Sequence, residues 1–364
     1  MPRVIGIDPG TVSVDLCGLD EGRVFLDASI PTAEALAAPA DLLALLRGHA
    51  PLDLVVGPSG YGLPLVRARD LSEEHLRLAY LAAEGESGGI GGLRTLLRAM
   101  ASSSLPIVLT PGVIHLPTVP DHRKVNRVDM GTADKVCAAA LAVSEQARRR
   151  GCHPREVSLI LLEMGGAFSA ALAVDGGRIV DGVGGSSGPI GLRAPGALDG
   201  EVAFLAGAVT KGLLFGGGAA SVAGTPAASI DALASDDSAP GRVAWDAYIE
   251  GAVKAVASMA VSVLRPHEVV LSGRAAGQAR VRAALASRLG VVLPGAAQVE
   301  LVGFAAHASQ AAQGAAVVAD GLAGGASAAL VETLGIAGAR GSVLDHLYVI
   351  SPGAARARLG LADS

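Results

Sequence analysis

Hydrophobic and polar positions alternate near the start of the chain in a way that predicts β-strands. An apolar run over residues 4–7 leads into Asp8 and a Pro-Gly turn, and a second run over residues 12–16 is followed by the turn-like residues 20–23. We therefore expect strands in hairpin order over residues 3–30. This pattern alone is equally explained by a surface hairpin with an ordinary turn.

A second copy of this pattern begins 155 positions further along the chain. Without a gap, Glu163 falls on Asp8 and Gly165 falls on Gly10, and the turn that closes each hairpin also aligns. The repeat predicts two halves built on one plan, with a ligand site between their glycine turns. The alternative is a chance match of two glycine-rich hairpins in a chain that contains 49 Gly.

Periodicity elsewhere predicts alternating helices and short buried strands. A polar helix and the glycine-rich stretch 86–92 suggest that residues 63–104 form an inserted subdomain or lid. We expect one domain over residues 1–153 and a second over 154–364, although no pattern places 326–364. The expected helices cover residues 33–49, 72–84, 93–100, 130–150 (with Thr132 as N-cap), 199–210, 245–264 and 305–322, and the expected strands cover 53–57, 106–109, 157–184 and 268–271.

Composition narrows the class of protein. The formal charge of −5 and an aromatic content of 3% argue against nucleic-acid binding by basic patches or stacking platforms. No apolar run is long enough to cross a bilayer, and the N-terminus does not resemble a signal peptide. Three scattered cysteines suit a reducing compartment. We expect a soluble cytoplasmic protein whose partner is a small molecule rather than nucleic acid or membrane.

The two turns carry groups suited to a polyphosphate. Backbone N–H groups at Gly10, Thr11, Gly165 and Gly166 can hold phosphate oxygens, and the Asp8 carboxylate can hold Mg²⁺. A third glycine-rich loop at Ser59 and Gly60 follows a buried strand, where ligand crevices of α/β sheets lie. A plain strand-to-helix connector is the alternative reading of that third loop.

Residues 8–11 resemble the first phosphate loop of the acetate and sugar kinase/heat-shock chaperone/actin superfamily, and residues 163–166 resemble its second. Pro9 resembles the proline in the first phosphate loop of the acetate and butyrate kinase branch, which reads Asn-Pro-Gly-Ser. To about Leu322 the chain resembles a family of predicted butyrate kinases. The resemblance implies an α/β protein of two similar ribonuclease H-like (actin-like ATPase) domains with a nucleotide cleft between them, ATP and Mg²⁺ as cofactors, and adenosine near Gly273 and Arg274.

In-line phosphoryl transfer needs a held cation and positive charge on the transferred group. Arg193 resembles the arginine that follows the glycine loop of butyrate kinases, and its forked guanidinium suits phosphoryl oxygens. Glu163 is a further catalytic candidate, since a glutamate can assist Mg²⁺ or orient water. It departs from the superfamily pattern, which usually has Asp there, and from acetate and butyrate kinases, which have His. Asp129 and Asp134 are general-base options for a hydroxyl acceptor.

A polar cluster precedes the helix that begins near residue 130. A carboxylate acceptor needs no base because it is already ionised, whereas an alcohol needs one, and the sequence leaves this choice open. The favoured reading is a kinase that phosphorylates a small carboxylic acid to an acyl phosphate. The candidate acceptor ligands, beside Ser59 and Gly60, are His122, Arg123, Lys124 and Arg127.

Two other functions stay open. A partner-coupled ATPase, like the dehydratase activators of this superfamily, needs cysteines for an iron–sulfur cluster, and the scattered cysteines argue against it. A nucleotide-binding regulator or scaffold is compatible with Glu163 and with the missing His. The sequence leaves open whether the chain forms a homodimer.

Overall fold

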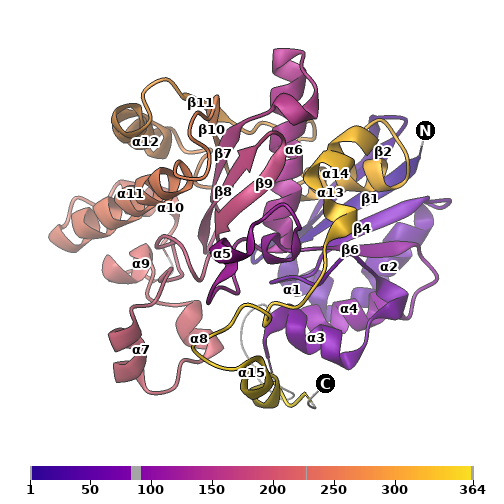
Figure 1. Cartoon of the computed structure of the whole chain (residues 1–364), viewed down its shortest axis with the longest axis horizontal. Coiled ribbons are helices and arrows are strands. Elements are labelled where there is room, and N and C mark those ends of the chain that lie inside the picture. Colours follow the sequence, from indigo (N-terminus) through magenta and orange to yellow (C-terminus); the bar gives the residue numbers. More distant parts are fainter. Residues whose placement is uncertain (1, 83–91, 227, 362–364) are drawn as a thin grey trace.

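The computed structural model describes residues 2–82, 92–226 and 228–361, and two β-sheets dominate it (Figure 1). The first three strands along the chain pair antiparallel, as in two successive hairpins. The first of these strands also pairs in parallel with the fourth. The order across this sheet is β3 (Arg23–Pro31), β2 (Ser13–Asp20), β1 (Arg3–Pro9), β4 (Leu54–Pro58), β6 (Ile107–Thr110) and β5 (Val66–Arg67).

The second sheet repeats this order without the last edge strand. Its hairpin strands are again antiparallel, and its remaining pairs are parallel. The order is β9 (Arg178–Val183), β8 (Ser169–Asp175), β7 (Leu159–Met164), β10 (Glu268–Ser272) and β11 (Ala297–Glu300).

The predicted repeat extends to local backbone detail. The N–H groups of Gly10 and Gly165 each donate to the carbonyl oxygen three positions further on, at 2.8 and 2.9 Å. Each hairpin also has one register shift, after Gly18 in the first and after Ala173 in the second. These positions are again 155 apart. The expectation of two halves on one plan is confirmed, and chance similarity is excluded.

The core has two parts, separated by the second sheet. Side chains alternate between the faces of a strand, so Leu159 and Leu161 of β7 join the larger cluster, which also holds the core of the first sheet. Ile160 and Leu162 join a smaller cluster on the opposite face.

Two connecting helices lie between the sheets, α6 (Ala133–Arg150) and α13 (Gln310–Leu322) (Figure 1). Glycines allow their close approach. A Cβ on Gly314 would lie 1.8 Å from the Cys137 carbonyl oxygen of α6, and a Cβ on Gly6 of β1 would lie 2.2 Å from Ala316 N. α13 thus packs on the first sheet, although it follows the second in sequence. It begins five residues later than expected.

In the first half, one sequence expectation is corrected and one stays a prediction. The helix expected over residues 33–49 is broken before Pro39, which cannot continue a helix. Leu76, Leu96 and Leu97, from the described part of residues 63–104, join the main core. Of the stretch 86–92 only Gly92 is described, so the inserted subdomain or lid stays a prediction. The helices are α1 (Thr32–Ala37), α2 (Pro39–Gly48), the 3₁₀ turns η1 (Ala68–Asp70) and η2 (Val113–His115), α3 (Glu73–Tyr80), α4 (Leu93–Ala101) and α5 (Asp121–Lys124).

The longest helix of the second half packs on the outer face of its sheet, where Tyr248, Ile249 and Ala252 join the smaller core cluster. The helix expected at 245–264 begins earlier, because Ser238 accepts the N–H of Gly241 as an N-cap. The helix expected at 199–210 ends at Ala206. The bounds are η3 (Pro154–Glu156), α7 (Gly200–Ala206), α8 (Lys211–Leu214), α9 (Ala219–Val222), α10 (Ile230–Ala234), α11 (Ala239–Met259) and α12 (Ala279–Val292).

The C-terminal segment, which no sequence pattern placed, returns to the first half. It forms α14 (Ala328–Leu334), η4 (Ile336–Gly338) and α15 (Pro352–Arg358). Arg356 pairs with Glu74 of α3 at 2.8 Å, and Arg77 donates to the Leu359 carbonyl. The division at residue 153 stays a prediction. Among the described helices, none has the length and apolar character that a bilayer span requires.

Candidate functional site

The glycine turns of the two hairpins lie close to each other where the two halves of the molecule meet. A Cβ on Gly166 would lie 3.6 Å from a Val12 methyl carbon and 3.7 Å from the Thr11 hydroxyl oxygen. Arg274, after β10, reaches across and places Nη2 3.3 Å from Ser13 Oγ. The two candidate phosphate turns therefore meet at one place, as the repeat predicts, and Arg274 of the candidate adenosine loop lies beside them.

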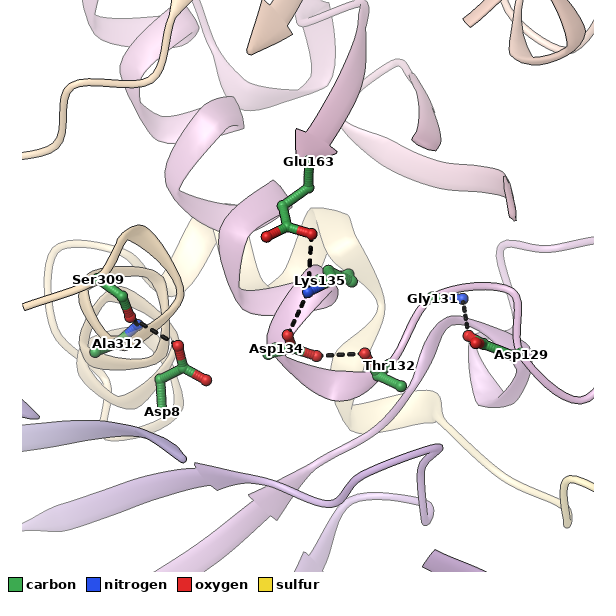
Figure 2. A network of polar contacts seen from close by, with 9 residues as sticks. All are labelled: Asp8, Asp129, Gly131, Thr132, Asp134, Lys135, Glu163, Ser309 and Ala312. Atoms are coloured by element: carbon green, nitrogen blue, oxygen red, sulfur yellow. Dashed lines mark hydrogen bonds and ion pairs between the residues drawn. The ribbon is translucent and has the colours of Figure 1, made fainter. Parts of the chain in front are cut away.

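Asp8, the residue before the last one of β1, points at the start of α13 (Figure 2). Its Oδ2 accepts a 2.7 Å hydrogen bond from the hydroxyl of Ser309, which in turn accepts the Ala312 N–H as the N-cap of α13. Burial, and then the nearby Asp134, raise the pKa of Asp8 to about 7. The protein therefore stabilises neutral Asp8 unless a cation approaches it.

Glu163 stands at the equivalent position of β7 but has an ion-pair partner. Its Oε2 lies 2.9 Å from Nζ of Lys135 on α6, and the same ammonium lies 2.5 Å from Asp134 Oδ2 (Figure 2). Burial would lower the pKa of Lys135, but the two carboxylates outweigh it and raise that pKa. Lys135 is therefore an ammonium ion that joins one half of the molecule to the other.

The first turn of α6 differs from the sequence expectation. Thr132 occupies the N-cap position, yet its side chain accepts no backbone N–H. Instead its hydroxyl donates to Asp134 Oδ1. Lys135 and Thr132 together lower the pKa of Asp134 despite its burial. Both oxygens of this candidate base are thus engaged, and its basicity is reduced.

Two glycines surround the other oxygen of Glu163. A Cβ on Gly165 would lie 3.0 Å from Oε1, and one on Gly273 would lie 2.9 Å from it. Gly273 also has φ +85° and approaches the Met164 carbonyl, so only glycine fits there without strain. The second phosphate turn and the candidate adenosine loop are therefore packed around the carboxylate of Glu163.

Asp129 holds two loops together. It is 5% exposed, and its carboxylate accepts hydrogen bonds from Gly131 N–H and from both the N–H and the hydroxyl of Ser186. Burial, the largest effect, raises the pKa of Asp129, and these donors oppose it. A carboxylate committed to three donors is poorly placed to accept a substrate proton, so the structure favours a loop-fixing role over the predicted catalytic one.

Ser59 is also engaged in the fold. It has no exposed surface, donates to the Thr110 carbonyl at 2.6 Å and accepts the Leu63 N–H at 3.0 Å. The predicted acceptor-binding role of Ser59 is therefore corrected to a structural one. Its neighbour Gly60 has φ +70° and accepts the Ala133 N–H at the start of α6 through its carbonyl.

Two basic residues of the polar cluster have structural partners. Arg123 donates to the Val180 carbonyl at 2.7 Å, which ties α5 to β9. Lys124 is 7% exposed and lies 3.7 Å from Asp121, and burial lowers its pKa. These contacts favour a structural role for Lys124, and the acceptor-binding roles of both residues stay predictions.

His122 and Arg127, from the same cluster, are exposed. Their roles remain predictions.

Arg193 lies beside the second phosphate turn through its backbone. Its N–H donates to the Ala167 carbonyl, next to Gly166, and its own carbonyl accepts the Gly218 N–H. The residue is exposed. The backbone contact keeps the start of the side chain near the turn, as the predicted role requires, and that role stays a prediction.

Sequence reasoning missed Lys135 and Ser309. A detectable signal existed for the lysine, because a cation in the first turn of a helix is unfavourable next to the positive end of the helix dipole. Lys135 therefore needs a strong anionic partner, and the glutamate at the second turn is one. Ser309 carried only the general preference of serine for N-caps.

A groove of about 550 Å³ opens beside Thr11 on the first half. Val12, Leu36 and the start of α1 line it, so its surface is mainly apolar. In the described part of the chain, no three His, Cys, Asp or Glu side chains converge on a common metal position. Mg²⁺ does not need such a cage, since it is commonly held by one or two carboxylates, waters and phosphate oxygens.

Comparison with known proteins gives a family and a fold. Residues 6–349 match the model of a family described as "Protein of unknown function (DUF1464)". No curated protein sequence matches the chain.

The solved structures of two kinases are similar to this one. A propionate kinase from Francisella tularensis has a TM-score of 0.61 at 12% identity, covering 86% of this chain and 99% of that one. Acetate kinase from Porphyromonas gingivalis has a TM-score of 0.60 at 13% identity, covering 86% and 98%. The predicted α/β fold of two actin-like ATPase domains is confirmed, whereas a specific likeness to butyrate kinases is not tested by these matches.

Proposed function

The chain belongs to the DUF1464 family, and we propose that it is an ATP-dependent phosphotransferase whose acceptor is a small carboxylic acid. The observation that carries this proposal is the pair of equivalent glycine turns, each with a carboxylate, that face each other on a fold shared with acetate and propionate kinases. Such an arrangement suits a triphosphate held from both sides.

The residues at the first turn fit Mg²⁺. Ser309 donates to Oδ2 of Asp8 and leaves Oδ1 to other ligands. Asp15, paired with Asp8 across β1 and β2, has a buried Oδ1 that finds no hydrogen-bond partner among the described residues. Asp8 would hold the cation, which supplies charge neutralisation for phosphoryl transfer. Gly10, Thr11, Gly165 and Gly166 would orient the phosphates, while Gly273 and Arg274 would contact adenosine.

The acceptor class follows from the state of the candidate bases. Asp134 is held by Lys135 and Thr132 and has a lowered pKa, and Asp129 is occupied by three donors. An alcohol needs a free base, whereas a carboxylate acceptor is already ionised and does not. The apolar groove beside Thr11 offers space for a short acyl chain.

Trapping the product tests this proposal. The purified chain is incubated with Mg-ATP, hydroxylamine and acetate, propionate or butyrate in turn, because hydroxylamine converts an acyl phosphate to a stable hydroxamate. We expect hydroxamate and ADP in equal amounts with at least one acid. Nucleotide binding without product from any carboxylic acid or alcohol would contradict the proposal.

That outcome would favour the alternative, a nucleotide-binding regulator or scaffold. The observation on its side is the ion pair of Glu163 with Lys135, which leaves the second turn without a free acid. A partner-coupled ATPase has less support, because Cys17 and Cys137 are buried.

A further inference from the structure

Lys135 occupies an unusual position for a lysine. Its side chain is 13% exposed, and its ammonium group contacts Asp134 on its own helix and Glu163 on the other half. A long side chain loses considerable conformational entropy when it is held in one place. Burial of the charge adds to that cost, so the ion pairs must be maintained by the surrounding structure.

The region around Lys135 is rich in negative charge. Asp134 and Asp15 both contribute to the raised pKa of Asp8, and Lys135 opposes them. Asp134 and Glu163 contact Lys135 directly, and the charge of the lysine also acts on Asp8. A triphosphate brought to the turns would meet strong repulsion from any carboxylate left unbalanced.

Glu163 presents the largest difficulty for phosphate binding. Its Oε1 borders Gly165 and Gly273, so its charge lies at the turn that would receive phosphate oxygens. The other oxygen faces Lys135. The lysine therefore supplies the counter-charge at the point where an anionic ligand and an anionic side chain would otherwise compete.

We propose that Lys135 is a positioning residue for nucleotide binding, which neutralises Glu163 and so allows the turn at Gly165 and Gly166 to accept the phosphates of ATP. This inference rests on the proposed function. It also accounts for a glutamate at a position where the resembling families have Asp or His: the longer acid reaches a lysine on α6.

Calorimetric titration of the full chain with Mg-ATP tests the proposal through four proteins. Lys135→Met should weaken binding about 10- to 100-fold, because it leaves Glu163 uncompensated. Lys135→Arg, which keeps the charge, should retain most of the affinity. In the double variant Lys135→Met/Glu163→Gln the acid at the second turn is neutral and only Asp134 has lost its cation, so affinity should be about five- to tenfold higher than in Lys135→Met.

The double variant separates an electrostatic role from a structural one. If Lys135 merely braced the fold, removing Glu163 as well would not restore binding, and that result would overturn the proposal. Equal affinity in Lys135→Met and the parent would also overturn it. Kinetics give a second readout: the KM for ATP should rise more than kcat falls.

Control measurements keep the two proposals distinguishable. Lys254→Met, at an exposed lysine of α11 paired with Glu250, should bind like the parent. Circular dichroism and melting curves verify that each variant is folded. A parent that binds no Mg-ATP rejects the proposed function and this inference with it, whereas binding by the parent and by Lys135→Met alike rejects only the role of Lys135.

Discussion

Asp8 and Glu163 stand at equivalent positions of two hairpins, yet different groups surround them. Asp8 accepts a hydrogen bond from a neutral hydroxyl, and its pKa rises to about 7. Glu163 lies 2.9 Å from the ammonium group of Lys135. The backbone repeat thus sets where each acid stands, while the neighbouring helices set its charge. One turn remains available to a cation, and the other already contains one.

The largest expected effect comes from removing the two acids separately. Asp8→Asn should lower Mg²⁺-dependent phosphoryl transfer on the order of 10³-fold, because a bound cation contributes several kcal/mol to such steps. Glu163→Gln should cost only about tenfold, since its charge is balanced within the protein. Steady-state ADP release measures both, and Asp175→Asn, at the exposed end of the second hairpin, is the matched control. Equal losses at the two positions would show that the acids have equivalent roles.

Arg193→Lys is expected to have the next largest effect. The substitution keeps the positive charge but loses the forked donors, so transfer should fall about 10²-fold while ATP affinity changes little. Turnover with the trapped acyl product, together with nucleotide titration, checks both values. Unchanged turnover would show that Arg193 takes no part in phosphoryl transfer. Arg242→Lys, on α11, is the control and should behave like the parent.

The environment of Asp8 also predicts a pH effect on the free protein. Burial and Asp134 raise its pKa in the folded state from 3.8 to about 7, so the native protein keeps a proton that the unfolded chain releases. Its contribution therefore lowers stability as pH rises from about 4 to about 7.

Asp8→Asn keeps an acceptor for Ser309 and removes this titration. At pH 8 the variant should be about 1–3 kcal/mol more stable than the parent, with little difference at pH 4. Urea denaturation at both pH values, without nucleotide, measures this. A variant that is less stable at pH 8 would contradict the raised pKa.

The smallest effect tests whether the turns are equivalent. A Cβ on Gly10 or on Gly165 would lie 3.0 Å from its nearest atom, whereas a Cβ on Gly166 would have no neighbour closer than 3.6 Å. Gly10→Ala and Gly165→Ala should each cost about 1 kcal/mol, and Gly166→Ala should be nearly neutral. Denaturation midpoints report all three. A large difference between the first two would break the structural equivalence of the turns.

The backbone plan of this protein can be read from its amino-acid sequence alone. Alternating apolar residues and glycine turns are local signals, so the repeated hairpins and the facing of their turns could be predicted from the order of residues. The same local signals located the long connecting helix α6 and the helix α13. The prediction of one helix over residues 33–49 was wrong, because Pro39 begins a second helix although the apolar pattern continues through it.

The contacts between polar groups, in contrast, depend on how the chain packs. Lys135 and Glu163 are on different halves, and Ser309 reaches Asp8 from a helix that returns from the far end of the chain. The sequence predicts a ligand-binding role for Ser59 and a catalytic one for Asp129, and only the structure shows their hydrogen bonds to the fold. Charge and hydrogen bonding depend on distances between remote segments, and those distances are fixed by the packing of α6 and α13 between the two sheets.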